Sequence, residues 1–298
     1  MTPTISLPAG LHYQGAVHTE VEFLKTNGIA EKVFVKKLAD KPYTWQARVA
    51  AIAIKRIGTI PIGAAVREEF INTGDFKIPE PINQLPLAEL NTLLVEIHRN
   101  LWQAIIPKQE FICKFCSKRL ENTIDLTKID YSPEDLEFIK KNPPESFTEI
   151  LVYLKDGFEI DDIKELSRED LIPYKGMNFN KLTFRVPVVK DAINHERFAE
   201  DTVDFWRKIS LDCLLKIESV EDGDTPTERL NAELPIIAKS YMGIRFFDLH
   251  LSSEDLKGIR EELTEYIPTL PFYYLDECPC DRRLMIPHVM EASGFFSE

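Results

Sequence analysis

Two close pairs of cysteines are the residues of this chain best suited to chemistry. The first pair lies in Cys113-Lys114-Phe115-Cys116 and the second in Cys278-Pro279-Cys280. Each pair follows a strand-like segment, Phe111-Ile112 for the first and Leu270 to Leu275 for the second. We therefore expect both pairs at the tips of hairpins, where a tight turn can aim two thiolates at one tetrahedral ion.

A structural zinc ion takes four ligands, and each pair supplies two. The sequence therefore predicts one composite structural zinc site, whose metal would contribute to the free energy of folding. Its ligands are Cys113, Cys116, Cys278 and Cys280. Vestigial or free thiols are the alternative, since Lys114 and Ser117 stand where zinc knuckles commonly have proline and glycine, and the second pair is one residue shorter. Redox chemistry is disfavoured, because it would need a pair at a helix start.

The fifth cysteine and the histidines add little to this site. Cys213 lies in the apolar segment Ile209 to Leu215 and is predicted to be a core residue. Among the six histidines only His288, eight residues after Cys280, is close to a cysteine pair. The chain has no glycine-rich phosphate loop and no Gly-x-Ser-x-Gly elbow. We therefore expect a protein that is not an enzyme.

Composition narrows the class of protein and its partners. A length of 298 residues fits one large domain or two modest ones. The 36 basic and 49 acidic residues give a net charge of −13, which repels phosphate backbones and anionic membranes. Neither a secretory signal nor an apolar run long enough to span a membrane is visible. Five cysteines in a long chain without a signal favour a reducing compartment, and their odd number argues against full disulfide pairing. Nucleic acid and membranes are therefore not the expected partners.

The elements around the cysteines follow an internal repeat. The segment Val21 to Leu24 matches Leu182 to Arg185, and the segment starting at Trp45 matches the one starting at Trp206, both 161 positions apart (182 − 21 and 206 − 45). Further on, Leu87 to Leu90 aligns with Ser253 to Leu256 at an offset of 166, and Cys113 aligns with Cys278 at 165. Such matches in the same order indicate a duplication.

The repeat predicts an α+β fold of two tandem copies, each a strand–helix–helix–strand unit that ends in a cysteine hairpin. We place the first copy at residues 1–140 and the second at 147–298, with a boundary in the proline-containing segment Ile139 to Ser146. Trp45 and Trp206 should then occupy equivalent buried positions. The alternative is two unrelated α+β stretches with ordinary helical patterns.

Local patterns mark individual elements. Apolar residues spaced by three and four positions predict an amphipathic helix from Leu87 to Ile105. A serine followed three residues later by an aspartate predicts helix starts at Ser132, Ser167 and Ser252. Strands are expected over Phe147 to Leu154 and Lys181 to Val186, with a turn at Lys155-Asp156-Gly157.

A second apolar pattern near the C-terminal end suggests a binding groove. Four residues recur at helical spacing and are followed by the aromatic segment Phe272-Tyr273-Tyr274. The four are Leu256, Ile259, Leu263 and Ile267. Grooves lined in this way bind amphipathic segments of partner proteins. Packing of these residues within their own domain is the alternative.

These features together resemble the baseplate hub assembly proteins of T-even-like contractile-tailed phages. The likeness is carried by the opening Leu7 to Leu11, the helix from Leu87, and the cysteine knuckle that leads into Thr123-Ile124-Asp125-Leu126. The second half resembles the same layout and closes on Gly294-Phe295-Phe296. The resemblance covers most of the chain in order, and it is specific around Arg99 to Leu126 and Tyr273 to Phe296.

The resemblance implies a non-enzymatic assembly or structural protein of a contractile phage tail or a phage-like injection system. It implies baseplate hub, tail-tube or tape-measure proteins as partners, and a location in the host cytoplasm during assembly or in the tail baseplate if the protein is retained. A zinc-ribbon-like adaptor for nucleic acid or protein is the alternative. Its basic patch would combine Lys114, Lys118, Arg119, Arg282 and Arg283. A cysteine-based enzyme is less favoured.

Overall fold

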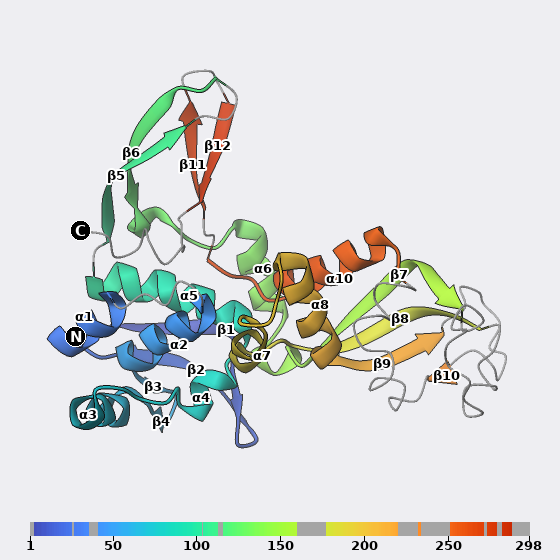
Figure 1. Cartoon of the computed structure of the whole chain (residues 1–298), viewed down its shortest axis with the longest axis horizontal. Helices are drawn as coiled ribbons and strands as arrows, with labels where there is room; N and C mark the ends of the chain where they lie inside the picture. Colours follow the sequence, from blue (N-terminus) through green and yellow to red (C-terminus); the bar gives the residue numbers. More distant parts are fainter. Residues whose placement is uncertain are drawn as a thin grey trace. The chain divides into compact units, whose positions relative to one another are not determined.

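The computed structural model has a mixed α+β fold with two four-stranded antiparallel sheets, each accompanied by helices (Figure 1). It describes residues 3–25, 27–35, 41–102, 104–112, 116–159, 177–219, 232–233, 251–270, 273–278 and 282–287. The chain forms two compact units. Unit 1 comprises Met1–Ser146, Val188–Arg197 and Ile267–Glu298, and unit 2 comprises Phe147–Pro187 and Phe198–Tyr266.

The sheet of unit 1 has the strand order β1-β2-β3-β4. Its strands are β1 (Thr4–Tyr13), β2 (Ala16–Phe23), β3 (Ile54–Ile57) and β4 (Ile60–Pro61). The helices are α1 (Gly28–Val35), α2 (Pro42–Ala53), α3 (Gly63–Thr73), α4 (Glu80–Asn83), α5 (Leu87–Ile97), α6 (Pro133–Lys141) and α7 (Val189–His195). Two hairpins complete unit 1, β5 (Ile105–Ile112) with β6 (Arg119–Asp125) and β11 (Tyr273–Cys278) with β12 (Arg282–Pro287).

Close packing of α2 against α5 forms the centre of unit 1. From Trp45 onward α2 is buried at nearly every position, and its four alanines, at 47, 50, 51 and 53, let a neighbouring helix approach closely. Helix α5 is likewise buried from Leu87 to Ile97 except at two positions. A separate buried cluster joins Val95 of α5 to Leu126, Ile129 and Leu270.

The first turn of α2 is capped by a residue distant in sequence. Its own N-cap residue, Lys41, makes no side-chain cap. The carboxylate of Glu196, which follows α7, accepts hydrogen bonds from the Tyr43 amide at 2.7 Å and the Thr44 amide at 3.2 Å. These two amides lie in the first turn, where no intrahelical acceptor exists, so Glu196 ties α7 to α2.

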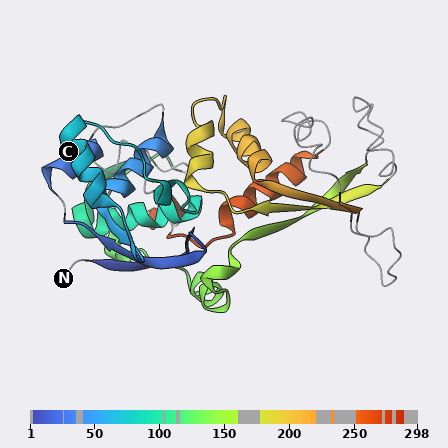
Figure 2. The same cartoon turned by 90° about the horizontal axis from the view of Figure 1, so that it is seen from below.

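The described residues of unit 2 form a sheet with two helices on one face. Its strands run in the order β10-β9-β8-β7. They are β7 (Glu149–Glu159), β8 (Asn178–Arg185), β9 (Leu214–Ser219) and β10 (Ala232–Glu233), and the helices are α8 (Thr202–Cys213) and α10 (Ser253–Glu265). Alternate residues of β7 are buried, as expected of a strand with one covered face. Figure 2 shows α8 and α10 on the same side of this sheet.

The two halves of the chain present their elements in the same order. The first half runs β1-β2-α1-α2-β3-β4 and continues through α5 to the β5–β6 hairpin. The second half runs β7-β8-α7-α8-β9-β10 and continues through α10 to the β11–β12 hairpin. The units divide this order differently, because α7 and the β11–β12 hairpin belong to unit 1. Unit 2 begins at Phe147, where the second expected domain (147–298) begins, but it does not include the whole of that range.

Several predicted helix signals are confirmed. Ser132 caps α6 in a reciprocal capping box with Asp135, and Ser252 caps α10 by accepting from the Asp255 amide at 3.1 Å. The third predicted start, Ser167, lies outside the described residues. The helix predicted from Leu87 to Ile105 ends earlier, at Ile97, and a π-helical turn (His98–Trp102) leads into β5.

The predicted turn at Lys155-Asp156-Gly157 is wrong, because these residues lie inside β7. The pairing of β7 with β8 shifts register between Tyr153 and Phe158, and the strand then continues to Glu159. Gly157 takes a left-handed backbone angle (φ 66°), which lets the chain bulge without ending the strand. Among the described residues, no helix is both long and apolar enough to cross a membrane.

Candidate functional site

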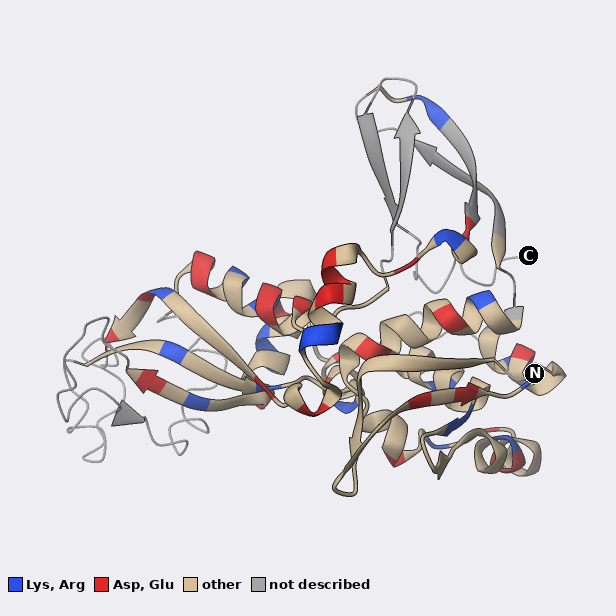
Figure 3. Ribbon diagram, turned by 180° about the vertical axis from the view of Figure 1, so that it is seen from behind, with Lys and Arg blue, Asp and Glu red and all other residues tan. Residues whose placement is uncertain are grey.

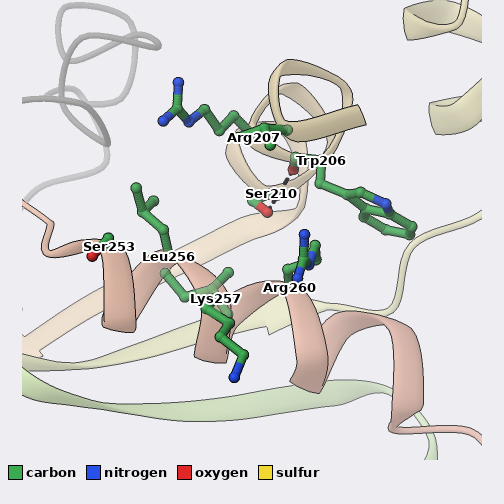
Figure 4. A pocket seen from close by; sticks show the side chains of 9 residues that line it. Trp206, Arg207, Ser210, Ser253, Leu256, Lys257 and Arg260 are labelled. Carbon is green, nitrogen blue, oxygen red and sulfur yellow. Dashed lines mark hydrogen bonds between the residues drawn. The ribbon is translucent and has the colours of Figure 1, made fainter. Parts of the chain in front are cut away.

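A pocket of about 190 Å³ lies between α8 and α10 of unit 2 (Figure 4). Helix α8 contributes Val203, Trp206, Arg207 and Ser210, and helix α10 contributes Ser253, Leu256, Lys257, Ile259 and Arg260. Spacings of three and four residues place the α8 members on one helical face. The pocket is therefore a seam between two facing helices.

The pocket combines apolar surface with positive charge. Figure 4 shows the side chains of Leu256 and Arg260 pointing toward α8, whereas Lys257 points away from it. The Ser210 hydroxyl donates to the Trp206 carbonyl oxygen at 2.7 Å, so it is already used within α8. Lys257 lies 3.5 Å from Glu261 on the exposed side of α10. Of the three cationic side chains that line the seam, Arg260 thus points into it, in a chain whose acidic residues are spread over both units (Figure 3).

The seam between α2 and α5 of unit 1 is closed. Counted from the first residue of each helix, Arg207 and Ser210 of α8 correspond to Ala47 and Ala50 of α2. Counted in the same way, Ser253 and Arg260 of α10 correspond to Leu87 and Leu94 of α5. All four unit 1 residues are buried, at 7% exposure or less. Small and apolar residues close the seam in unit 1, and polar or charged ones stand at the same positions in unit 2.

The predicted groove residues, three on α10 and Ile267 just after it, are mostly part of the core. Ile259, Leu263 and Ile267 are buried, so packing within the protein, the alternative interpretation, is correct for them. Leu256 is only partly buried and lines the pocket. The side chains of the aromatic segment Phe272-Tyr273-Tyr274 lie outside the described part of the structure.

The prediction that Trp45 and Trp206 are equivalent is wrong. Both α2 and α8 have 12 residues and run directly into a strand, so counting from their starts pairs Trp45 with Phe205. Trp45 and Phe205 are both buried, while Trp206 faces the pocket. From Phe184 to the start of α8 the chain is one residue shorter than from Phe23 to the start of α2, and this shift explains why a match of tryptophans in the sequence misplaces them.

The predicted zinc ligands fall only partly within the described residues. Cys116 lies in the β5–β6 turn and is half-buried, and Cys278 is the last residue of β11, opposite Arg282. Cys113 and Cys280 lie outside the described residues, as does His288. The described residues contain no group of three or more histidine, cysteine or acidic side chains that could hold a metal. The zinc site therefore stays a prediction, whereas the prediction that Cys213 is a core residue is confirmed.

Sequence reasoning missed two acids that anchor the first strand of each sheet. Glu89, the third residue of α5, accepts hydrogen bonds from the Ala9 amide at 2.6 Å and the Gly10 amide at 3.0 Å. Asp255, the third residue of α10, accepts from the Lys155 amide at 2.7 Å. Burial raises the pKa of Glu89 to about 7, against the effect of the two amides. The two acids align with each other at the offset of 166 found for their helices (255 − 89), and this match is the signal in the sequence that could have identified them.

Comparison with known protein families, curated proteins and solved structures found no match for this chain.

Proposed function

We propose that the protein is a non-enzymatic assembly protein that binds a segment of another protein in the α8–α10 pocket. In line with the family resemblance, the process would be assembly of a contractile tail baseplate, with a hub, tail-tube or tape-measure protein as the partner. The observation that carries the proposal is the open, cationic seam in unit 2 at the position where unit 1 is closed.

The lining of the pocket suits an amphipathic segment that carries a carboxylate beside a large apolar side chain. Leu256 and Trp206 offer apolar and aromatic surface, which anchors such segments in helix grooves. Arg260, whose side chain points toward α8, carries a planar guanidinium group that can pair with a carboxylate through two hydrogen bonds. The chain as a whole has a net charge of −13, which repels an acidic segment. The positive charge at the pocket attracts such a segment, so it favours binding at this place.

We also propose that the two sheets with their helices are copies of one ancestral unit, as the sequence repeat predicts. The pairing of β1 with β2 supports this, because it has the same register as that of β7 with β8. The pairs Thr4↔Glu22, Ile5↔Val21, Ser6↔Glu20, Leu11↔His18 and His12↔Val17 correspond to Leu151↔Thr183, Val152↔Leu182, Tyr153↔Lys181, Phe158↔Phe179 and Glu159↔Asn178. The numbers differ by 147 on every first strand and by 161 on every second strand.

Irregular features support the duplication more strongly than regular pairing does. Both first strands bulge at the same place, with a left-handed glycine at Gly10 (φ 68°) and Gly157 (φ 66°). Both second strands shift register against the third strand just before a phenylalanine, Phe23 or Phe184. Unrelated sheets have no reason to share a bulge, its glycine and a second register shift, since bulges are specific local features.

Duplication gives the open seam a functional interpretation. In a pair of copies, a closed apolar seam is the arrangement that maximises burial, as in unit 1. Replacing Ala47 and Leu94 by their unit 2 counterparts Arg207 and Arg260 gives up that burial. A binding role for the seam explains why unit 2 has accepted this loss.

The experiment converts the unit 2 seam into the unit 1 seam. We expect the double variant R207A/R260L to fold at least as stably as the unchanged protein, because it installs residues that close the same seam in unit 1. Binding of the unchanged protein to each hub, tail-tube and tape-measure protein of the same tail is measured by titration calorimetry. We expect one of them to bind, and the variant to bind it at least tenfold more weakly.

The matched control removes the same charge elsewhere. K140A/K141L changes two exposed lysines on α6 and should leave the affinity unchanged. Equal binding by R207A/R260L would contradict the pocket as the site. Failure of all tail proteins to bind would contradict the proposed function, and retention on RNA or DNA at physiological salt would instead favour the adaptor alternative.

A further inference from the structure

The outer face of β7 carries two large apolar side chains on an edge strand. Strand β7 ends the sheet order β10-β9-β8-β7. Leu151 is 49% exposed and Tyr153 is 67% exposed, although their neighbours Ile150 and Val152 are buried on the other face. An exposed, apolar edge strand favours pairing with another strand, and proteins usually protect such edges with charged residues.

The corresponding residues of unit 1 are polar. The shared register of the two sheets places Thr4 at the position of Leu151 and Ser6 at that of Tyr153. Both are exposed, as their counterparts are, so exposure is a property of the position and apolarity is particular to unit 2. The apolar pair is therefore not required by the fold.

Within the described part of the chain, no strand pairs with the outer edge of β7 at the same residues. The Thr148 carbonyl oxygen accepts from the Val186 amide at 3.3 Å, continuing the β7–β8 register by one pair. Because hydrogen-bonding direction alternates along an antiparallel strand, Ile150 and Val152 also face β8. The amide and carbonyl groups of Glu149, Leu151 and Tyr153 then face the open edge. The alternation agrees with Lys155, whose amide turns away from β8 to Asp255.

We propose that this edge pairs with the same edge of a second copy of the chain, as antiparallel strands related by a two-fold axis at Val152. In this register Leu151 lies opposite Tyr153 of the second copy, and the reverse. Both residues offer edge-facing main-chain groups, so the two pairs form a hydrogen-bonded ladder. The four apolar side chains gather on the outer face, while α8 and α10 lie on the opposite face of each sheet.

Charge fits this register and selects a second copy over an unrelated strand. Glu149 lies opposite Lys155 of the second copy, so the strand complements its own charges at both ends. Lys155 is paired with Glu254 at 2.9 Å, but both side chains are about two-thirds exposed, and exposed pairs of this kind are weak. The ladder ends at Tyr153 because Asp255 already holds the Lys155 amide. The Glu149–Lys155 contact is therefore made between side chains.

The experiment uses charge reversal on the full chain. Sedimentation velocity over a range of concentrations should show the unchanged protein as a dimer. E149K and K155E alone should each weaken the dimer at least tenfold, because each places like charges opposite one another. An equimolar mixture of the two variants should dimerise like the unchanged protein, because every reversed charge then meets an opposite one across the two-fold axis.

A second variant separates the interface from folding. L151T/Y153S installs the residues that unit 1 has at these positions, so it should fold with an unchanged circular dichroism spectrum and sediment as a monomer. A monomer for the unchanged protein at every concentration would overturn the proposal. So would a dimer that L151T/Y153S does not weaken, or charge variants that fail to restore one another on mixing.

Discussion

At the scale of single residues, Glu89 supplies the hydrogen-bond acceptor that the neighbouring strand does not supply to two amides of β1. A bulge leaves backbone amides without a strand partner, and a buried unpaired amide costs about 1–3 kcal/mol. One carboxylate oxygen of Glu89 accepts from both bulged amides, Ala9 and Gly10. The other oxygen has no hydrogen-bond partner within the described structure. A neutral acid therefore suits this position better than an ion, and the raised pKa of Glu89 has this origin.

The raised pKa predicts how stability depends on pH. Folded Glu89 holds its proton up to a pKa of about 7, while the unfolded chain loses it near 4.5, so folding weakens as pH rises between these values. At about 1.4 kcal/mol per pKa unit, the loss is roughly 3 kcal/mol. Glutamine accepts the same two hydrogen bonds without ionising. We therefore expect E89Q to be more stable than the unchanged protein at pH 8 and nearly equal at pH 4.5, measured by urea unfolding.

The control for this prediction is E68Q, which neutralises an exposed acid on α3. It should leave the pH dependence of unfolding as it is in the unchanged protein. A slope between pH 4.5 and 7 that E89Q does not alter would show that Glu89 is ionised in the folded protein.

Residues with nearby partners were predictable from the sequence, and those with distant partners were not. Ser132 and Ser252 bond amides three residues away, so a short pattern is enough to find them. Glu89 and Asp255 bond amides 80 and 100 positions away, and in the sequence each is only an acid near a helix start. Asp255 also belongs to the capping pattern that starts at Ser252, so the sequence offers no reason to expect its second role as acceptor for the Lys155 amide.

At the scale of elements, the bulged first strand is the shared signature of both sheets. A glycine is needed there because φ is positive and because the partner strand lies close. A Cβ atom on Gly10 or Gly157 would lie 2.9 Å from the carbonyl oxygen of His18 or Phe179. The sequence Lys-Asp-Gly predicts a turn as readily as a bulge, because glycine at positive φ occurs in both. The pairing of Phe158 and Glu159 with β8, beyond Gly157, shows that this segment is a bulge and not a turn.

Two glycines of unit 2 should respond in opposite ways to alanine. We expect G157A to lower the free energy of unfolding by about 1–3 kcal/mol, through backbone strain and the contact with Phe179. Gly258 lies inside α10 with open space around it, so G258A should raise the free energy of unfolding by about 0.5–1 kcal/mol. Chemical denaturation of both variants gives the comparison. A stable G157A protein would mean that the bulge is not a fixed feature of β7.

At the scale of the whole molecule, the order of elements was predictable but their grouping was not. The repeat indicated two successive copies, and the chain does present two similar series of elements. The compact units do not coincide with these two copies, because residues 188–197 and 267–298, which follow the start of the second copy, belong to unit 1. The contacts responsible include the Val189 amide to the Leu85 carbonyl oxygen at 2.9 Å and the Leu270 amide to the Thr92 hydroxyl at 3.3 Å. Contacts of this kind, between segments far apart in the chain, produce no repeating pattern in the sequence.

The grouping of the hairpins bears directly on the zinc hypothesis. Both the β5–β6 and the β11–β12 hairpins belong to unit 1, although about 160 positions separate them in sequence. The last ladder pairs, Ile112↔Arg119 and Cys278↔Arg282, bring each hairpin to its cysteines. One ion held by both hairpins would close a very long loop, and cross-links of long loops stabilise chiefly by restricting the unfolded chain.

If Cys113, Cys116, Cys278 and Cys280 share one ion, the purified protein should contain about one zinc per chain, measured by plasma mass spectrometry. Replacing any one of the four cysteines with serine should remove the metal. Each replacement should lower the melting temperature by a similar amount, because the loss of any ligand disrupts the same site. C213A is the control, since Cys213 is a buried core residue and its loss should lower the melting temperature while the zinc stays bound. The four thiols should resist a thiol reagent until a chelator is added. Reaction of all four without chelation, in a metal-free protein that melts normally, would identify them as free thiols.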